Sequence, residues 1–173
     1  MRRQKGASSA STLLLEKPLI FGIDVVPGRG PVVTVPFRSE DDFARLRPLE
    51  PEVDLAHVIE TVRLVRAELD PAACTLLGFA GGPFTVASYL VEGGPSKTFS
   101  RLKAFMHAQP VLWDRLVDQL ADLAIDFLTA QVRAGAQAVQ VFDSWAGSLS
   151  RAQYARFAVP ATRKVLDAVR ALG

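Results

Sequence analysis

The sequence contains very little cysteine, histidine and tyrosine: one Cys, Cys74, and two each of His and Tyr among 173 residues. A single cysteine excludes an intrachain disulfide and a cysteine-rich zinc site within this chain, and it is typical of a reducing compartment. Cys74 enters an apolar run, so we interpret it as a small core residue. No apolar run is long enough to cross a bilayer as a helix. These features favour a soluble, cytoplasmic protein.

Net charge is also low, at +2, which is too small to indicate nucleic acid or an anionic membrane as a partner. By contrast, 49% of the residues are hydrophobic, so the chain can bury a substantial core. Its length suits about one domain.

The first residues differ in composition from the rest. Residues 1–12 are basic and then rich in Ser and Ala, and the apolar run over 13–15 is too short for a signal peptide. We therefore expect residues 1–21 to be an atypical N-terminal segment and a candidate for disorder. Residues 22–173 are expected to form the folded unit.

Two apolar segments, 75–79 and 136–142, are predicted to be buried strands, and each is followed by a glycine-containing loop and a helix. An earlier apolar run at 19–26 is predicted to be a strand or a buried loop, and residues 32–35 a short strand. Hydrophobic spacing, glycines and prolines predict further elements. These are helices over 40–47, 55–69, 85–91, 96–108, 111–134, 150–158 and 160–172.

The repeated order of strand, loop and helix argues for an α/β fold with parallel strands. A complete eight-stranded barrel typically needs about 250 residues. The chain is therefore expected to be either a small open sheet or part of a larger barrel.

Ligands in parallel α/β folds bind at the carboxyl ends of the strands. Two segments take that position here: 78–85, with Tyr89 one turn into the following helix, and 143–147. The glycines allow close backbone approach to a ligand, and Tyr89 and Ser144 offer neutral hydroxyl donors suited to carboxylate or pyrrole groups. An equally open interpretation is that the glycines only make turns and the hydroxyls only cap helices.

Several other polar residues allow two interpretations. Asp143 follows a strand end and could act in a cleft, or it could cap a helix and bond its own loop. Arg29 and Arg38 could meet substrate carboxylates, although solvated side chains are favoured. His57 and His107 fall on predicted helices and are interpreted as surface residues. A row of aspartates is interpreted as a solvated helix face: Asp114, Asp118, Asp122 and Asp126.

Three segments together resemble the uroporphyrinogen decarboxylase family. Residues 78–94 (GFAGGPFTVASYLVEGG) resemble its glycine-rich segment, in which an aromatic–Thr pair leads to a substrate-contacting tyrosine. Residues 140–147 (QVFDSWAG) resemble its second hallmark, in which a serine touches the substrate. Residues 22–32 resemble the segment that precedes both, and order and spacing agree over 22–173.

The resemblance implies that Tyr89 and Ser144 bind substrate and that Phe79 and Gly81 line the cleft. It also implies a (β/α)8 barrel, a homodimer, and a lyase that needs neither cofactor nor metal. The implied reaction removes the four acetate carboxyl groups of uroporphyrinogen III to give coproporphyrinogen III in haem biosynthesis.

The sequence also departs from the family pattern. The family's Arg-Gln-Ala-Gly-Arg stretch and its catalytic Ser-Asp-Ile segment have no counterpart, and residues 11–20 do not match where that aspartate belongs. The region with a substrate-binding histidine does not follow residue 173, so the chain covers about half of a usual family member. No catalytic residue can be assigned, and we expect this chain alone to have little or no decarboxylase activity.

Two further readings compete with the decarboxylase. A related corrinoid or thiol methyltransferase would need zinc held by Cys and His, and the one cysteine and two helical histidines argue against it. A non-catalytic piece of a barrel would leave large apolar patches uncovered and would be poorly soluble.

Overall fold

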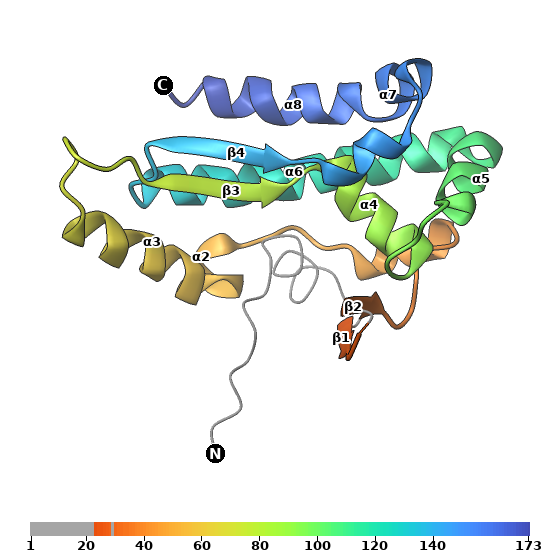
Figure 1. The fold of residues 1–173 in the computed structure, drawn as a ribbon, viewed down its shortest axis with the longest axis horizontal. Helices are drawn as coiled ribbons and strands as arrows, with labels where there is room; N and C mark the ends of the chain where they lie inside the picture. The colour runs from red at the N-terminus through yellow and green to blue at the C-terminus, as the bar shows by residue number, and fades with distance from the viewer. Residues whose placement is uncertain (1–22, 29) are drawn as a thin grey trace.

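The computed structural model describes residues 23–28 and 30–173 (Figure 1). The expected N-terminal segment 1–21 lies outside these residues, as does Arg29. In chain order the elements are β1 (Ile23–Val26), β2 (Gly30–Val33), the 3-10 helix η1 (Glu40–Arg45), α2 (Pro51–Asp54), α3 (Ala56–Glu68), β3 (Leu77–Gly81), α4 (Pro83–Glu92), α5 (Ser100–Ala108), α6 (Pro110–Arg133), β4 (Ala138–Phe142), the 3-10 helix η2 (Ser144–Ser148), α7 (Arg151–Phe157) and α8 (Val159–Arg170).

The centre of the described fold is a pair of parallel strands, β3 and β4, as the repeated strand–loop–helix order predicted. They pair in register from Leu77 opposite Ala138 to Gly81 opposite Phe142. Helices α4, α5 and α6 connect them, since parallel strands need a long crossover. Figure 1 shows α6 behind the two strands and α8 running alongside them. The structure therefore has the α/β architecture expected from the sequence.

Helix α6 provides most of the core on which the sheet rests. Pro110 stands at its first position, where the missing N–H costs nothing. Its apolar residues recur at helical spacing, and Trp113, Leu116 and Leu128 are completely buried. Each such side chain contributes about 1.5–3 kcal/mol on burial. The expectation of a helix over 111–134 is confirmed to within one residue at each end.

Gly135 ends this helix for two physical reasons. Its φ of +114° lies in a region that side chains disfavour. A Cβ at this position would also meet Cγ of Arg66, which reaches over from α3, at 2.6 Å. The glycine therefore lets α3 approach the turn between α6 and β4.

Several predicted boundaries need correction, among them the helix expected over 96–108, which begins at Ser100, and the strand expected at 136–142, which begins at Ala138. The strand expected at 75–79 is β3 at 77–81, because its pairing with β4 sets where the ladder begins. The strand expected at 32–35 is β2 at 30–33, which pairs antiparallel with β1 and then donates Val33 N–H to Gly93 O at 2.9 Å. The helix expected over 40–47 is the shorter 3-10 helix η1. Ser39 N–H donates to the Asp42 carboxylate at 2.9 Å, as the capping pattern predicted.

The expectation that both strands are buried is wrong for one face of the sheet. Leu77, Phe79 and Phe142 are 48%, 41% and 46% exposed, because no described layer of the chain covers that face. Ala80, whose side chain points the other way, is fully buried. The β3–β4 sheet thus has one covered face and one open apolar face.

Cys74 is exposed rather than part of the core, because β3 begins three residues later and Cys74 lies in the preceding turn. His57 and His107 are exposed on helices, as expected. The aspartate row of α6 is exposed but also ion-paired: Asp114 pairs with Arg156 at 2.7 Å, and Asp118 and Asp122 pair with Lys164 at 2.7 Å.

Candidate functional site

The carboxyl ends of β3 and β4 are joined directly. Gly82 N–H donates to Phe142 O at 2.7 Å, which extends the ladder one residue beyond β3. The rings of Phe79 and Phe142 meet edge to face on the open side, with centroids 5.8 Å apart. The loops that follow the two strands therefore start side by side, as the sequence predicted for 78–85 and 143–147.

Tyr89 on α4 is stacked on Trp145 of η2, with ring centroids 3.9 Å apart and planes inclined by 28°. Phe99 packs against the same indole edge to face at 5.1 Å. Ser144 precedes Trp145 and is exposed. The structure thus brings together Tyr89 and the loop that carries Ser144, two residues 55 positions apart in the sequence.

Asp143 connects these two loops through hydrogen bonds. Its Oδ1 accepts from the backbone N–H of Thr85 at 2.9 Å and from the Thr85 hydroxyl at 2.7 Å. The Thr85 hydroxyl in turn accepts from Trp145 N–H at 3.2 Å. Of the two roles considered for Asp143, the structure therefore shows the capping one.

The environment of Asp143 disfavours its charged form. Burial raises the pKa of this carboxyl, and the hydrogen bonds from Thr85 and the nearby Thr162 side chain oppose the rise only in part. Its second oxygen, Oδ2, is buried without a hydrogen bond to any described residue, and the same holds for the Thr162 hydroxyl. The Thr162 hydroxyl therefore lowers the pKa of Asp143 as a polar neighbour, since neither this hydroxyl nor Oδ2 makes a hydrogen bond of normal geometry.

The four predicted binding residues lie in different environments. Tyr89 is half-buried, and burial raises the pKa of its phenol, so the hydroxyl is a neutral donor at ordinary pH. Ser144 is exposed, Gly81 is buried at the end of β3, and Phe79 lies on the open face. Within the described part of the chain, neither the Tyr89 nor the Ser144 hydroxyl has a hydrogen-bond partner. Both are therefore available to a ligand.

Sequence reasoning did not single out Thr85 or Gln131 as organisers of this region. Gln131 of α6 accepts from Phe79 N–H and donates to Phe79 O, both at 3.0 Å, and so satisfies the edge of β3. For Thr85 a signal was present: Gly82 and Pro83 start a helix with no capping side chain of their own. Such a start requires an acceptor from elsewhere in the fold.

Arg38 is exposed, as the favoured interpretation expected, and it also makes hydrogen bonds to the backbone. Its guanidinium donates to Phe37 O at 2.8 Å and to Val91 O, so it links the backbone at residue 37 to the last turn of α4. Burial lowers the pKa of Arg38, and the neighbouring Arg101 lowers it further. Its guanidinium thus uses backbone carbonyls as hydrogen-bond acceptors.

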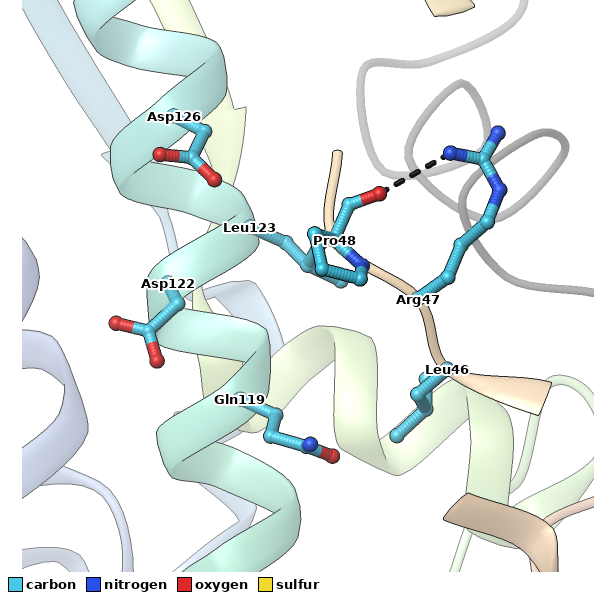
Figure 2. Close-up of a pocket in the computed structure, with 7 residues that line it drawn as sticks. All are labelled: Leu46, Arg47, Pro48, Gln119, Asp122, Leu123 and Asp126. Carbon is cyan, nitrogen blue, oxygen red and sulfur yellow. Dashed lines mark hydrogen bonds between the residues drawn. The ribbon is translucent and has the colours of Figure 1, made fainter. Parts of the chain in front are cut away.

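A cavity of about 150 Å³ lies elsewhere, between α6 and residues 46–48 (Figure 2). Figure 2 shows Gln119 and Leu123 directed toward Leu46 and Pro48, whereas the carboxylate of Asp122 on the same helix points away from them. Burial raises the pKa of Asp126, and the nearby Asp122 raises it further. Arg47 also lines this small cavity, which includes none of the four predicted residues.

Residues 23–28 and 30–173 offer neither a metal site nor a membrane-spanning helix. No group of three or more His, Cys, Asp or Glu side chains is placed to hold a metal ion. No helix is both long and apolar enough to span a membrane.

Comparisons with known proteins agree on one family. The family model for uroporphyrinogen decarboxylase (URO-D) matches residues 10–173. The uroporphyrinogen decarboxylases of Streptomyces griseus and Streptomyces coelicolor are each 51% identical over 157 residues, 91% of this chain and 42% and 43% of those proteins. That of Geobacillus kaustophilus is 47% identical over 152 residues, 87% of this chain and 43% of its own length. The chain thus spans less than half the length of these curated relatives, and it belongs to the uroporphyrinogen decarboxylase family.

Proposed function

We propose that this chain supplies one wall of the substrate cleft of a uroporphyrinogen decarboxylase. The observation that carries the proposal is the meeting of Tyr89 with the Asp143–Gly147 loop at the carboxyl ends of β3 and β4. In parallel α/β folds this edge is where ligands bind. Tyr89 and Ser144 would donate hydrogen bonds to the porphyrinogen, with Phe79 and Gly81 beside them.

The substrate chemistry suits such a wall. Each step breaks the bond between an acetate methylene and its carboxyl group, and carbon dioxide leaves. The electron pair that remains needs a sink, which protonation of the pyrrole ring carbon provides. A buried carboxylate near the ring nitrogens would stabilise the resulting positive charge. No residue of this chain is assigned that role. We therefore expect the catalytic residues in the parts of the longer relatives that this chain does not match.

The proposed complete fold is a (β/α)8 barrel, to which residues 22–173 contribute the central part and residues 1–21 an atypical start. The open face of the sheet supports this arrangement, because alternate residues of barrel strands point into a packed interior. Phe79 and Phe142 would then lie inside the barrel, near its carboxyl-terminal mouth. The outward N–H and C=O groups of Val139 and Val141 would pair with the next strand. We further propose a cytoplasmic homodimer.

A chimera tests the function. Residues 22–173 would replace the matching segment of the Streptomyces griseus relative, and coproporphyrinogen formation from uroporphyrinogen would be assayed without oxygen. We expect activity in the chimera and none in the isolated chain. In the chimera, Tyr89→Phe and Ser144→Ala should each lower kcat/KM about 10- to 100-fold, since a hydrogen bond to a charged group contributes about 1.5–3 kcal/mol.

Arg156→Ala is a suitable control, because Arg156 is exposed and its partners, Asp114 and the ring of Phe157, are not among the four predicted binding residues. A folded but inactive chimera would count against the proposal, as would Tyr89 and Ser144 variants with unchanged kinetics. Activity of the isolated chain would show that residues not identified above fill the catalytic role.

A further inference from the structure

Helix α4 begins without a cap of its own. Its N-cap is Gly82, which has no side chain, and Pro83 stands at the first helical position. The N–H of Thr85, at the third position, would normally need a nearby side-chain acceptor. That acceptor is Asp143 Oδ1, which arrives from the end of β4 at 2.9 Å. The cap of α4 is therefore supplied by the other strand's loop.

The side chain of Thr85 extends the same connection to η2. Its hydroxyl donates to Asp143 Oδ1 at 2.7 Å and accepts from Trp145 N–H at 3.2 Å. One threonine thus uses both its donor and an acceptor lone pair between two loops. The bonds link the first turn of α4 to the backbone of the residue that stacks on Tyr89.

The close seating of Asp143 depends on Gly82. A Cβ at Gly82 would lie 2.7 Å from both Cβ and Cγ of Asp143 and 2.9 Å from its Oδ1. No side chain fits in that space, so the carboxylate can reach Thr85 only over a glycine. The contact therefore depends on the absence of a Cβ at residue 82.

We propose that Asp143 and Thr85 are positioning residues that hold Tyr89 against Trp145 and so set the place of Ser144. Tyr89 lies one helical turn beyond Thr85, and Ser144 and Trp145 directly follow Asp143. Rotation of α4 or displacement of the η2 loop would break the Thr85 bonds and separate the two rings. That the positioned groups contact a porphyrinogen rests on the function proposed above.

The hydrogen bonds between residue 143 and Thr85 use only one of the two carboxylate oxygens of Asp143. Oδ2 is buried and unbonded within the described residues, beside an equally unbonded Thr162 hydroxyl. Only Oδ1 carries the link to Thr85. An asparagine would keep that acceptor and replace Oδ2 by a donor suited to Thr162. Asp143→Asn should therefore preserve the geometry, whereas Asp143→Ala should not.

The test compares matched variants of the whole chain by near-ultraviolet circular dichroism and tryptophan fluorescence, which report the Tyr89–Trp145 stack. Trp145→Phe identifies the signal of that stack against Trp113, which is fully buried in α6. Thr85→Val and Asp143→Ala should lose this signal. Thr85→Ser and Asp143→Asn should retain it. Ile59→Val, buried in α3 away from these loops, should lower stability and leave the signal intact.

Anaerobic titration of the chimera described above with uroporphyrinogen provides a second readout, in which Thr85→Val and Asp143→Ala should weaken binding on the order of tenfold. The proposal is overturned if folded Thr85→Val keeps the stack signal, or if the Ser and Asn variants lose it as fully as the Val and Ala variants. If Asp143→Ala does not fold, the comparison of Thr85→Val, which is nearly isosteric with the wild type, and Thr85→Ser still tests the proposal. A chimera without substitutions that does not bind uroporphyrinogen, with the spectra of the chain as expected, would weaken the proposed function and leave the positioning role intact.

Discussion

The two faces of the β3–β4 sheet differ sharply in how far the described chain satisfies them. On the covered face Ala80 is fully buried, and Gln131 of α6 bonds both backbone groups of Phe79. On the open face, apolar side chains such as Phe79 and Phe142 remain more than 40% exposed. The covered face is packed by other parts of the chain. The open face carries large apolar side chains, but no described element packs against them.

The largest expected effect comes from removing a ring on the covered side. Phe84 is fully buried, and its ring lies 5.7 Å from that of Trp113. Phe84→Ala should cost about 3–5 kcal/mol in the free energy of unfolding, because it leaves a cavity. Phe79→Ala, the same substitution on the open face, should cost about 1 kcal/mol or less. Urea denaturation of both variants measures the contrast, and equal losses would show that the open face is packed in solution.

A substitution at the junction of the two loops should have the next largest effect. In Gly82→Ala the new Cβ would overlap Asp143 at 2.7 Å, so the free energy of unfolding should fall by about 1–3 kcal/mol. Gly147→Ala is the matched control, because nothing lies within 4 Å of the Cβ it would add. Thermal unfolding measures both. A Gly82→Ala variant as stable as the control would contradict the close seating of Asp143.

The pH dependence of stability should reveal the buried carboxyl. Because the pKa of Asp143 is raised in the folded protein, its contribution is present at acid pH and is lost as pH rises from the ordinary value through the folded one. Asn does not titrate. The free energy of unfolding of the wild type, relative to that of Asp143→Asn, should therefore fall over this interval and level off above it. Denaturation series at several pH values measure this difference, and a rise instead of a fall would show that the carboxylate is stabilised in its charged form.

The smallest effect on folding is expected from a charge placed on the open face. Phe79→Lys should change the free energy of unfolding by about 1 kcal/mol or less, because the side chain already reaches solvent. It should nevertheless reduce self-association, since the apolar patch is interrupted. Light scattering and sedimentation velocity measure the second effect. An unchanged association state would show that other surfaces cause any aggregation.

The long helix and the order of elements could be predicted because they depend on local patterns. Pro110, the apolar spacing of α6 and Gly135 are all visible in the sequence, and the structure confirms them within one residue. The predictions were wrong where pairing with a segment distant in the sequence set the position of an element. The start of β3 depends on its register with β4, and the exposure of Cys74 depends on where that ladder begins.

In the candidate site, too, some features could be predicted from the sequence and others could not. The two glycine-containing loops and the hydroxyls of Tyr89 and Ser144 could be identified from the sequence, because parallel strands place their carboxyl ends at one edge. The sequence also carried the family resemblance, which the comparisons confirm.

Only the tertiary structure showed that Asp143 caps α4 through Thr85 and that Tyr89 stacks on Trp145. The reason is physical. Helix periodicity and turn chemistry act between residues a few positions apart, whereas these contacts join groups 56 to 58 positions apart, whose meeting depends on the pairing of two strands. The sequence by itself determined the elements and their family, and the packed fold decided which polar groups meet.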